Sequence, residues 1–159
     1  MPRPSPVSAL RMAAAALLLP IASDASEPGT AIYQSRCLPC HQAGGVGAPG
    51  LAPPLAGVVG AYVANEAGRA YLAQVVVFGL NGPIRSQAQP FNAVMPPLAV
   101  LSDEEIAAVL NFVLSDFNRA LLPAQHRPLT AGEVAAVRNR APSMRDLRQM
   151  HARLAGETK

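Results

Sequence analysis

The chain has 159 residues and a net charge of +3, and half of its residues are apolar although only 4% are aromatic and none is Trp. This length holds one compact domain with extensions and makes a multidomain enzyme improbable. All seven aromatic side chains lie between Tyr33 and Phe117, which marks the predicted core. Residues 26–118 sum to −3 and residues 119–159 to +5, so the excess of positive charge belongs to a C-terminal segment.

The first 25 residues have the pattern of a secretory signal peptide. Arg3 and Arg11 precede the apolar run Met12–Ala22, and small residues follow it up to Ala25. An apolar run of this length is well short of the roughly 18 to 20 residues that span a bilayer, so a membrane anchor is the weaker interpretation. No Cys ends the segment to carry a lipid. We expect cleavage after about Ala25 and a periplasmic, oxidising location.

Both cysteines of the chain lie in one C-x-x-C-H pentapeptide, Cys37–His41. In a helical turn Cys37 and Cys40 lie side by side, so their thiols can add to the two vinyl groups on one edge of a porphyrin. His41 then falls under the iron. The pentapeptide therefore predicts one covalently bound haem c.

Three alternatives compete for these residues. A structural zinc site needs four ligands, and beyond the pentapeptide only His126 and His151 remain as further imidazoles, both far along the chain. A redox dithiol needs a strand–helix–strand setting that the sequence does not offer. A simple disulfide is the third alternative in an exported protein.

A loop and two helices are predicted after the pentapeptide. Six of the twelve glycines and three prolines lie in residues 42–60, which suits a backbone that runs flat against a flat ligand, or else a flexible linker. A helix is expected over residues 65–78, with Gly79 as its stop and with one side that packs the haem edge. That side consists of Tyr71, Leu72, Val75 and Val76. A second helix begins at Ser102, where Glu105 completes a capping box, and continues with an apolar face through Phe117.

Met95 is the candidate for the distal iron ligand, because it is the only Met of the core window. Two prolines follow it and favour an extended backbone that can hold the thioether in place. A His41/Met95 pair would give a closed iron of raised reduction potential. The alternatives are that Met95 fills the core or that His126 or His151 supplies a second imidazole.

The C-terminal segment, residues 119–159, is predicted to contain two short helices. One starts at Thr130, with Glu133 in a capping box, and the other follows Ser143 to about Leu154. Leu147, Met150 and Leu154 align on the second helix. The segment is expected to be a solvated extension, to dock onto a redox partner through these apolar residues, or to contact anionic lipid peripherally.

Residues 28–118 resemble a class I cytochrome c domain. The resemblance rests on Gly29-x-x-x-Tyr33, the C-x-x-C-H run, the run Pro53–Gly57, Gly79-x-x-Gly82, and Met95 with the helix that follows. It implies an all-α fold of three to four helices around one covalent haem, with the C-terminal segment as an added helical extension. It also implies that the Pro53 carbonyl accepts the Nδ1 proton of His41, with Pro54 as the alternative, that Leu55 contacts the haem, and that Phe112 lies where the last helix of the domain crosses the first.

The resemblance further implies a one-electron carrier without catalytic residues. The motifs are most like those of small cytochrome subunits that accept electrons from periplasmic dehydrogenases and pass them to an oxidase or another cytochrome of the respiratory chain. Such a carrier has no small-molecule substrate and binds no nucleic acid. The alternative is a haem-based ligand sensor or a small peroxidase with a displaceable Met95, although the neighbours of Met95 offer no proton-transfer groups.

Overall fold

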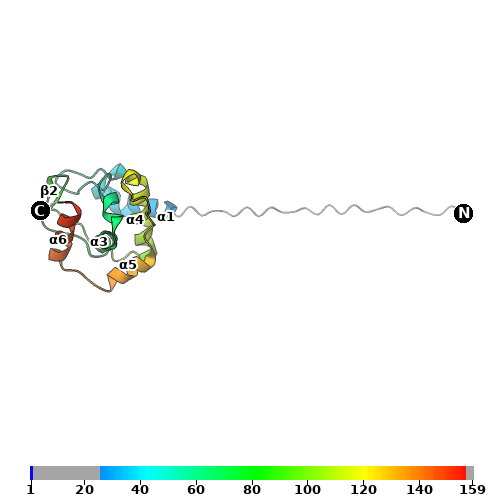
Figure 1. The fold of residues 1–159 in the computed structure, drawn as a ribbon. Coiled ribbons are helices and arrows are strands. Elements are labelled where there is room, and N and C mark those ends of the chain that lie inside the picture. The colour runs from blue at the N-terminus through cyan, green and yellow to red at the C-terminus, as the bar shows by residue number, and fades with distance from the viewer. Residues whose placement is uncertain (2–25, 157–159) are drawn as a thin grey trace.

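The structure is a computed structural model that describes Met1 and residues 26–156 (Figure 1). The predicted signal peptide therefore lies outside the described residues, apart from Met1. The helices are α1 (Ser26–Ile32), α2 (Leu38–His41), α3 (Glu66–Phe78), α4 (Asp103–Phe117), α5 (Ala131–Arg138) and α6 (Met144–Leu154). A π-helical turn, η1 (Tyr33–Cys37), joins α1 to α2, and 3-10 turns cover η2 (Ala43–Gly45), η3 (Val59–Ala64) and η4 (Arg119–Leu121).

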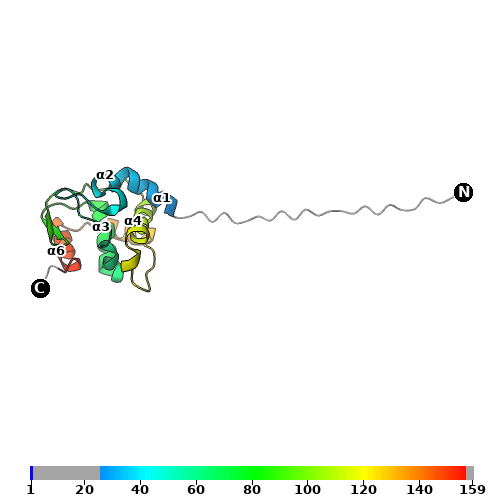
Figure 2. The same ribbon diagram turned by 90° about the horizontal axis from the view of Figure 1, so that it is seen from above.

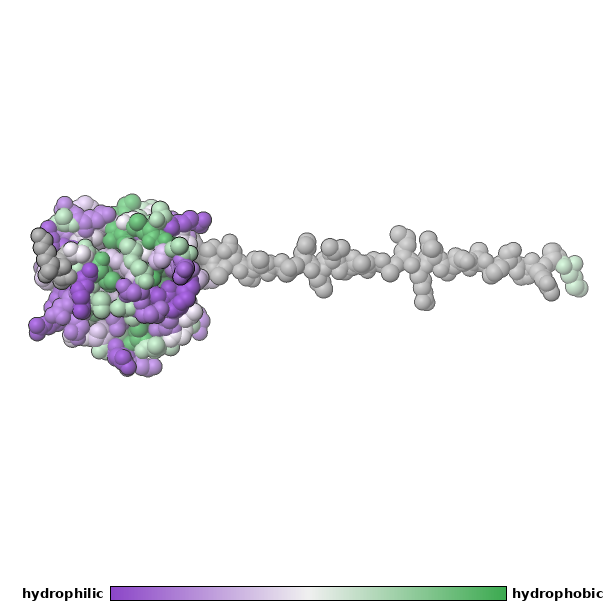
Figure 3. Space-filling model, viewed as in Figure 1, coloured by the Kyte–Doolittle hydropathy of each residue, from purple (hydrophilic) through white to green (hydrophobic). Residues whose placement is uncertain are grey.

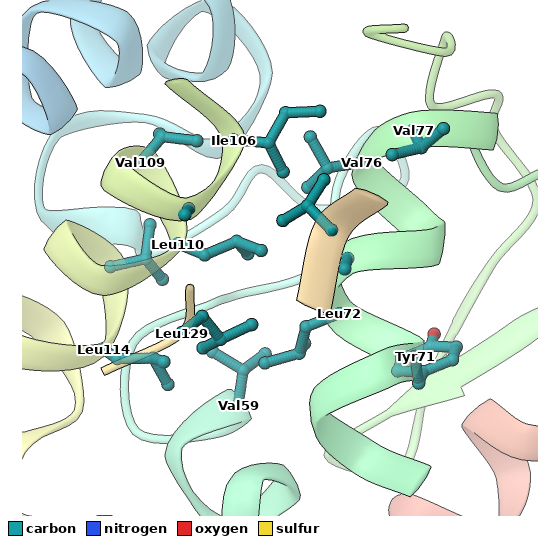
Figure 4. Packing of buried hydrophobic residues seen from close by; sticks show 14 of the residues in the cluster. Val59, Tyr71, Leu72, Val76, Val77, Ile106, Val109, Leu110, Leu114 and Leu129 are labelled. Atoms are coloured by element: carbon teal, nitrogen blue, oxygen red, sulfur yellow. The ribbon is translucent and has the colours of Figure 1, made fainter. Parts of the chain in front are cut away.

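The core forms where α3 and α4 pack together. Leu72 and Val76 of α3 point toward α4, whose Ile106 and Leu110 point back, as Figure 4 shows. The helix α1 crosses α4 at Gly29, where a Cβ atom would lie 2.4 Å from the carbonyl oxygen of Ala108. Only glycine allows this close crossing, so the predicted contact between the first and last helices of the domain is confirmed.

An aromatic cluster supports this crossing. The ring of Tyr33 lies 5.5 Å from that of Phe112 and 5.1 Å from that of Phe117, measured between centroids. Its hydroxyl donates a hydrogen bond of 2.7 Å to the carbonyl of Gln42, directly after α2. Tyr33 thus ties the helix crossing to the start of the Gly-rich loop.

The predicted helix starts are confirmed by their caps. Asn65 caps α3 by accepting from the backbone N–H of Gly68, and Gly79 ends the helix with a φ of 74°. Complete capping boxes start α4 at Ser102, α5 at Thr130 and α6 at Ser143. In α4, α5 and α6, a short polar side chain followed three residues later by an acid therefore marks the helix start.

A two-stranded hairpin was not predicted. The strands β1 (Ile84–Ser86) and β2 (Gln89–Phe91) pair antiparallel, with Ile84 opposite Phe91. The turn between them places Gln87 and Ala88 at φ values of 48° and 64°. Such a turn usually contains Asn or Gly, so its residues gave no signal in the sequence.

The C-terminal segment packs onto the domain, which corrects our expectation of a solvated or partner-bound extension. The helix α5 lies against α3 and α4, and α6 lies against α3, so that α3 sits between α4 and α6 (Figures 1 and 2). Leu129, Val134 and Leu147 are at most 3% exposed. Leu147 therefore fills this chain's own core and cannot anchor a partner.

An ion pair between the buried Arg69 and the partly exposed Glu133 holds α5 in place. Arg69 of α3 is 4% exposed, and its Nε lies 2.7 Å from Oε1 of Glu133. The same guanidinium donates to the carbonyls of Arg127 and Pro128 at 2.8 and 3.0 Å. Every donor direction of Arg69 toward the C-terminal segment thus has an acceptor, as a buried charge requires.

The surface agrees with this packing. Figure 3 shows many hydrophilic residues over the lower part of the molecule, where Figure 1 places α5, and a group of hydrophobic residues in the upper middle. Most C-terminal arginines, among them Arg140, Arg145 and Arg153, are exposed. Among the described residues, no helix is both long and apolar enough to cross a bilayer.

Candidate cofactor site

An apolar cleft lies between the α2 turn, the Gly-rich loop, α3 and the segment around Met95. Its empty space, open mouth included, is about 1100 Å³. The cleft brings together all six residues that the sequence singled out as cofactor contacts: Cys37, Cys40, His41, Pro53, Leu55 and Met95. Three of the four α3 residues expected to pack a ligand, Tyr71, Leu72 and Val75, also line it, whereas Val76 faces the core.

The two cysteines lie at the π-helical turn and in α2, and both are free thiols. Burial, together with the negative charge that Cys40 would carry, raises the pKa of the Cys37 thiol to about 11. The disulfide alternative is therefore absent from this structure. The described residues also contain no group of three or more His, Cys, Asp and Glu side chains arranged to hold a metal ion, as the zinc alternative requires.

His41 is buried and held in one orientation. Its Nδ1 lies 3.0 Å from the carbonyl oxygen of Pro53. A carbonyl only accepts, so Nδ1 carries the proton and Nε2 keeps its lone pair. Burial lowers the pKa of the His41 ring, and the hydrogen bond to Pro53 partly opposes this effect. The lowered pKa favours the neutral imidazole. The hydrogen bond is the one that the resemblance implied, and it uses Pro53 rather than Pro54.

Glycines in the loop let Pro53 reach His41. Gly47 has a φ of 75°, and a Cβ atom there would lie 2.6 Å from the backbone nitrogen of Pro54. Its own N–H donates to the carbonyl of His41 at 2.9 Å. Further on, Leu55 and Ala56 both donate to the carbonyl of Gly45. The loop thus folds back on itself by backbone hydrogen bonds and leaves Pro53 and Leu55 on the cleft wall.

Met95 is positioned through its backbone. It forms an isolated antiparallel bridge with Leu80, with hydrogen bonds of 2.8 and 3.1 Å. Gly79 permits this approach, because a Cβ atom there would lie 2.5 Å from the carbonyl oxygen of Met95. The end of α3 therefore fixes the segment that presents Met95, as the Pro-Pro context suggested.

The C-terminal segment contributes to the cleft wall, which the sequence did not indicate. His151, named above only as an alternative second imidazole far along the chain, is 5% exposed and lines the cleft. The reason is that α6 folds back against α3. Both ring nitrogens of His151 have hydrogen-bond partners, Tyr71 and the carbonyl of Arg85, so neither is directed freely toward a metal. His126 does not line the cleft.

The cleft fits a covalently attached haem. Its walls are largely apolar, two free thiols one helical turn apart lie on its edge, and a neutral imidazole with an available Nε2 faces it. A model of the cytochrome c family matches residues 26–116. The chain belongs to the cytochrome c family.

Two relatives from Thermus thermophilus are similar to this cytochrome c. Both are named cytochrome c-552. One is 44% identical over 114 residues, covering 72% of this chain and 76% of the relative. The other is 44% identical over 110 residues and covers 69% of this chain and 83% of the relative. As a member of this family the protein binds haem c covalently and serves as a haem-based electron carrier.

Proposed function

We propose that the protein is a periplasmic one-electron carrier whose haem iron is ligated by His41 and Met95. It would accept electrons from a dehydrogenase and pass them to an oxidase or another cytochrome of the respiratory chain. The observation that carries the proposal is that His41, with Nε2 free of the Pro53 hydrogen bond, and Met95 line one cleft although they come from separate parts of the chain.

The second observation is the chemistry of this ligand pair. The Pro53 carbonyl accepts the Nδ1 proton, which fixes the ring and raises the donor strength of Nε2. A thioether as the other ligand favours ferrous iron, and two protein ligands leave no position for a substrate. The bound haem supplies the one-electron chemistry. The chain itself supplies the ligands and an apolar wall that keeps water away.

The periplasmic location rests on the signal-like pattern of residues 1–25 and on the C-x-x-C-H run. The two Thermus relatives carry cytochrome names and identify neither a donor nor an acceptor. The proposal that a dehydrogenase is the electron donor rests on the resemblance of the motifs to those of small cytochrome subunits. Electron transfer rather than catalysis follows from the closed ligand pair.

Replacing Met95 tests the ligand set. In Met95→Ala the long-wavelength sulfur-to-iron absorption band of the oxidised protein should disappear and the reduction potential should fall, because the sulfur ligand is lost. Met144→Ala is the matched control: Met144 packs against the core of the same chain but does not line the cleft, so the band should persist. A Met95→Ala protein that retains the band would refute the proposed ligand.

A further inference from the structure

Beyond the turn that carries Cys37, Cys40 and His41, the polar side chains of the cleft gather at one place. They are Tyr62, Tyr71, Ser86 and His151. The ring of Tyr62 lies 6.1 Å from that of Tyr71 and 6.5 Å from that of His151, between centroids. Tyr71 points to the side of α3 away from α4, as Figure 4 shows, and α6 brings His151 to it. We call these four residues the polar end of the cleft.

The hydrogen bonds at His151 fix which atom carries each proton. Nε2 lies 2.6 Å from the carbonyl oxygen of Arg85, which only accepts, so Nε2 is an N–H donor. In the neutral ring Nδ1 is then the acceptor, and the Tyr71 hydroxyl 2.9 Å away donates to it. When the ring is protonated Nδ1 becomes a donor to the Tyr71 oxygen. The Tyr71 proton is then free to turn toward the cleft.

The ligand chemistry of this end follows from the haem. The macrocycle carries vinyl groups on one edge and two carboxylates on the edge opposite, so thioether bonds to Cys37 and Cys40 direct the carboxylates away from α2. Buried carboxylates need hydrogen-bond donors. On the described wall of the cleft, apart from residues 36–41, the side chains able to donate are those of the polar end.

We propose, on the basis of the proposed function, that His151 is a positioning residue of the haem site. It directs the hydroxyl of Tyr71, and the Tyr71–His151 pair forms part of the place where the haem carboxylates lie. The helix α6, which follows the residues matched by the family model, thereby becomes part of the cofactor site.

The groups around His151 determine how a bound, anionic haem would act on it. The groups that face it are Tyr71 from α3, Tyr62 from η3 and Arg85 from β1, and no carboxylate of the described residues forms an ion pair with it. On α6 itself the charged neighbours are Arg145, Asp146, Arg148 and Arg153. The haem carboxylates would therefore be the negative charges that stabilise the imidazolium.

This arrangement couples proton uptake by His151 to reduction of the haem iron. The electron enters from the redox partner, and reduction removes one positive charge from the iron, which makes proton uptake from water by His151 more favourable. The reduction potential should then fall as the pH rises. A donor to a haem carboxylate also offsets part of its negative charge, so loss of the donor should lower the potential.

The test compares His151→Gln with His126→Gln in the full-length haem protein. A Gln amide can donate to the Arg85 carbonyl and accept from Tyr71, as neutral His151 does, but it cannot take up a proton. Between about pH 5 and 8 the reduction potential of the wild type should decline as the pH rises. In His151→Gln the slope of this decline should be at least threefold smaller. At high pH the potentials of the variant and the wild type should be equal. His126→Gln should keep the wild-type slope, because His126 does not line the cleft.

Tyr71→Phe gives a second measurement that keeps the ring and removes only the hydroxyl. Its potential should lie below that of the wild type at acid pH. The proposal is overturned if His151→Gln keeps the wild-type slope, if Tyr71→Phe keeps the wild-type potential, or if the wild type shows no slope. These readings require covalent haem but not Met95 ligation, so failure of the proposed ligand set in Met95→Ala is a separate result.

Discussion

The Gly-rich loop, residues 42–60, and the C-terminal segment, residues 119–156, build the two sides of this molecule by different means. The loop is held mainly by backbone hydrogen bonds, such as those from Leu55 and Ala56 to Gly45, and it depends on positive φ angles at glycines. The C-terminal segment is held by side chains, namely buried aliphatic residues and the ion pair of Glu133 with the buried Arg69. Composition predicts the first kind of structure well and the second kind poorly.

The charges of the C-terminal segment show why. Arg138 donates to the carboxylate of Asp103 and to the carbonyls of Ala99 and Leu101, all around the start of α4. A basic segment was expected to remain outside the fold because burying arginine is costly. Instead the domain provides acceptors for Arg138, and the segment provides Glu133 for the domain's own buried Arg69. Net charge alone therefore does not separate an extension from a packing layer.

We expect the largest effect on stability when the chain is ended at Asn118, which removes the C-terminal segment. This removes the buried side chains of Leu129, Val134, Val137 and Leu147. At roughly 2 kcal/mol for each buried side chain, the loss is about 8 kcal/mol, which is within the range of total domain stability, about 5 to 15 kcal/mol. We expect the shortened protein to lose its cooperative thermal unfolding transition, followed by circular dichroism. A transition at the full-length midpoint would show that the segment is dispensable.

Removing the charge of Glu133 tests its ion pairs with Arg69 and Arg127 without removing any buried aliphatic side chain. Glu133→Gln should lower the free energy of unfolding by about 3 kcal/mol at pH 7, because Arg69 stays buried without its carboxylate. The exposed Glu104 on the same domain is the control, and Glu104→Gln should change stability by less than about 0.5 kcal/mol. Denaturant titrations of the two variants measure the difference.

The pH dependence of this contribution follows from the pKa of Glu133. Hydrogen bonds from Arg69 are the main cause that lowers this pKa to about 2, whereas an unfolded Glu titrates near about 4.3. The stabilisation is therefore complete above about pH 5 and is lost as the pH falls toward 2. The stability difference between wild type and Glu133→Gln should shrink over that interval. A difference that stays constant there would contradict the assignment.

Two glycines of the loop allow a comparison in which the expected difference in stability is the smallest. Gly47 and Gly50 both have positive φ angles, but a Cβ atom at Gly47 would meet Pro54 whereas one at Gly50 would meet nothing within 4 Å. Gly50→Ala should cost about 1 kcal/mol of backbone strain. Gly47→Ala should cost about 2 kcal/mol more, since the Pro53–Pro54 backbone must shift. Equal unfolding free energies for the two variants would show that the close approach to Pro54 is unimportant.

Local signals predicted the helices because they depend on neighbours in the sequence. Ser102, Thr130 and Ser143 each form the predicted cap. The hairpin turn at Gln87 and Ala88 was missed because its positive φ angles are imposed by the tertiary structure rather than by these residue types. The π-helical form of Tyr33–Cys37 was likewise not indicated by the sequence.

The site was predicted to the extent that motifs define it. The pentapeptide, the Pro53 hydrogen bond and the cleft position of Met95 all rest on patterns within one window of the chain. The contribution of α6 could not be found this way. The Tyr71–His151 contact joins residues 80 positions apart, and the Arg69–Glu133 pair joins residues 64 apart. The available clue to the packing of the C-terminal segment was Arg69, a charged residue within α3 that needs a carboxylate partner when buried.

Placement of His151 in α6 also bears on how the protein is assembled. The thiols that receive the haem lie near the start of the described chain, and the helix that completes the cleft wall is the last one in it. The cysteines precede α6 along the chain, so the cleft is open on this side as long as α6 has not packed against α3. Haem can therefore enter the cleft without unfolding α6 from a complete structure. The cleft wall is therefore complete only after α6 has packed against α3.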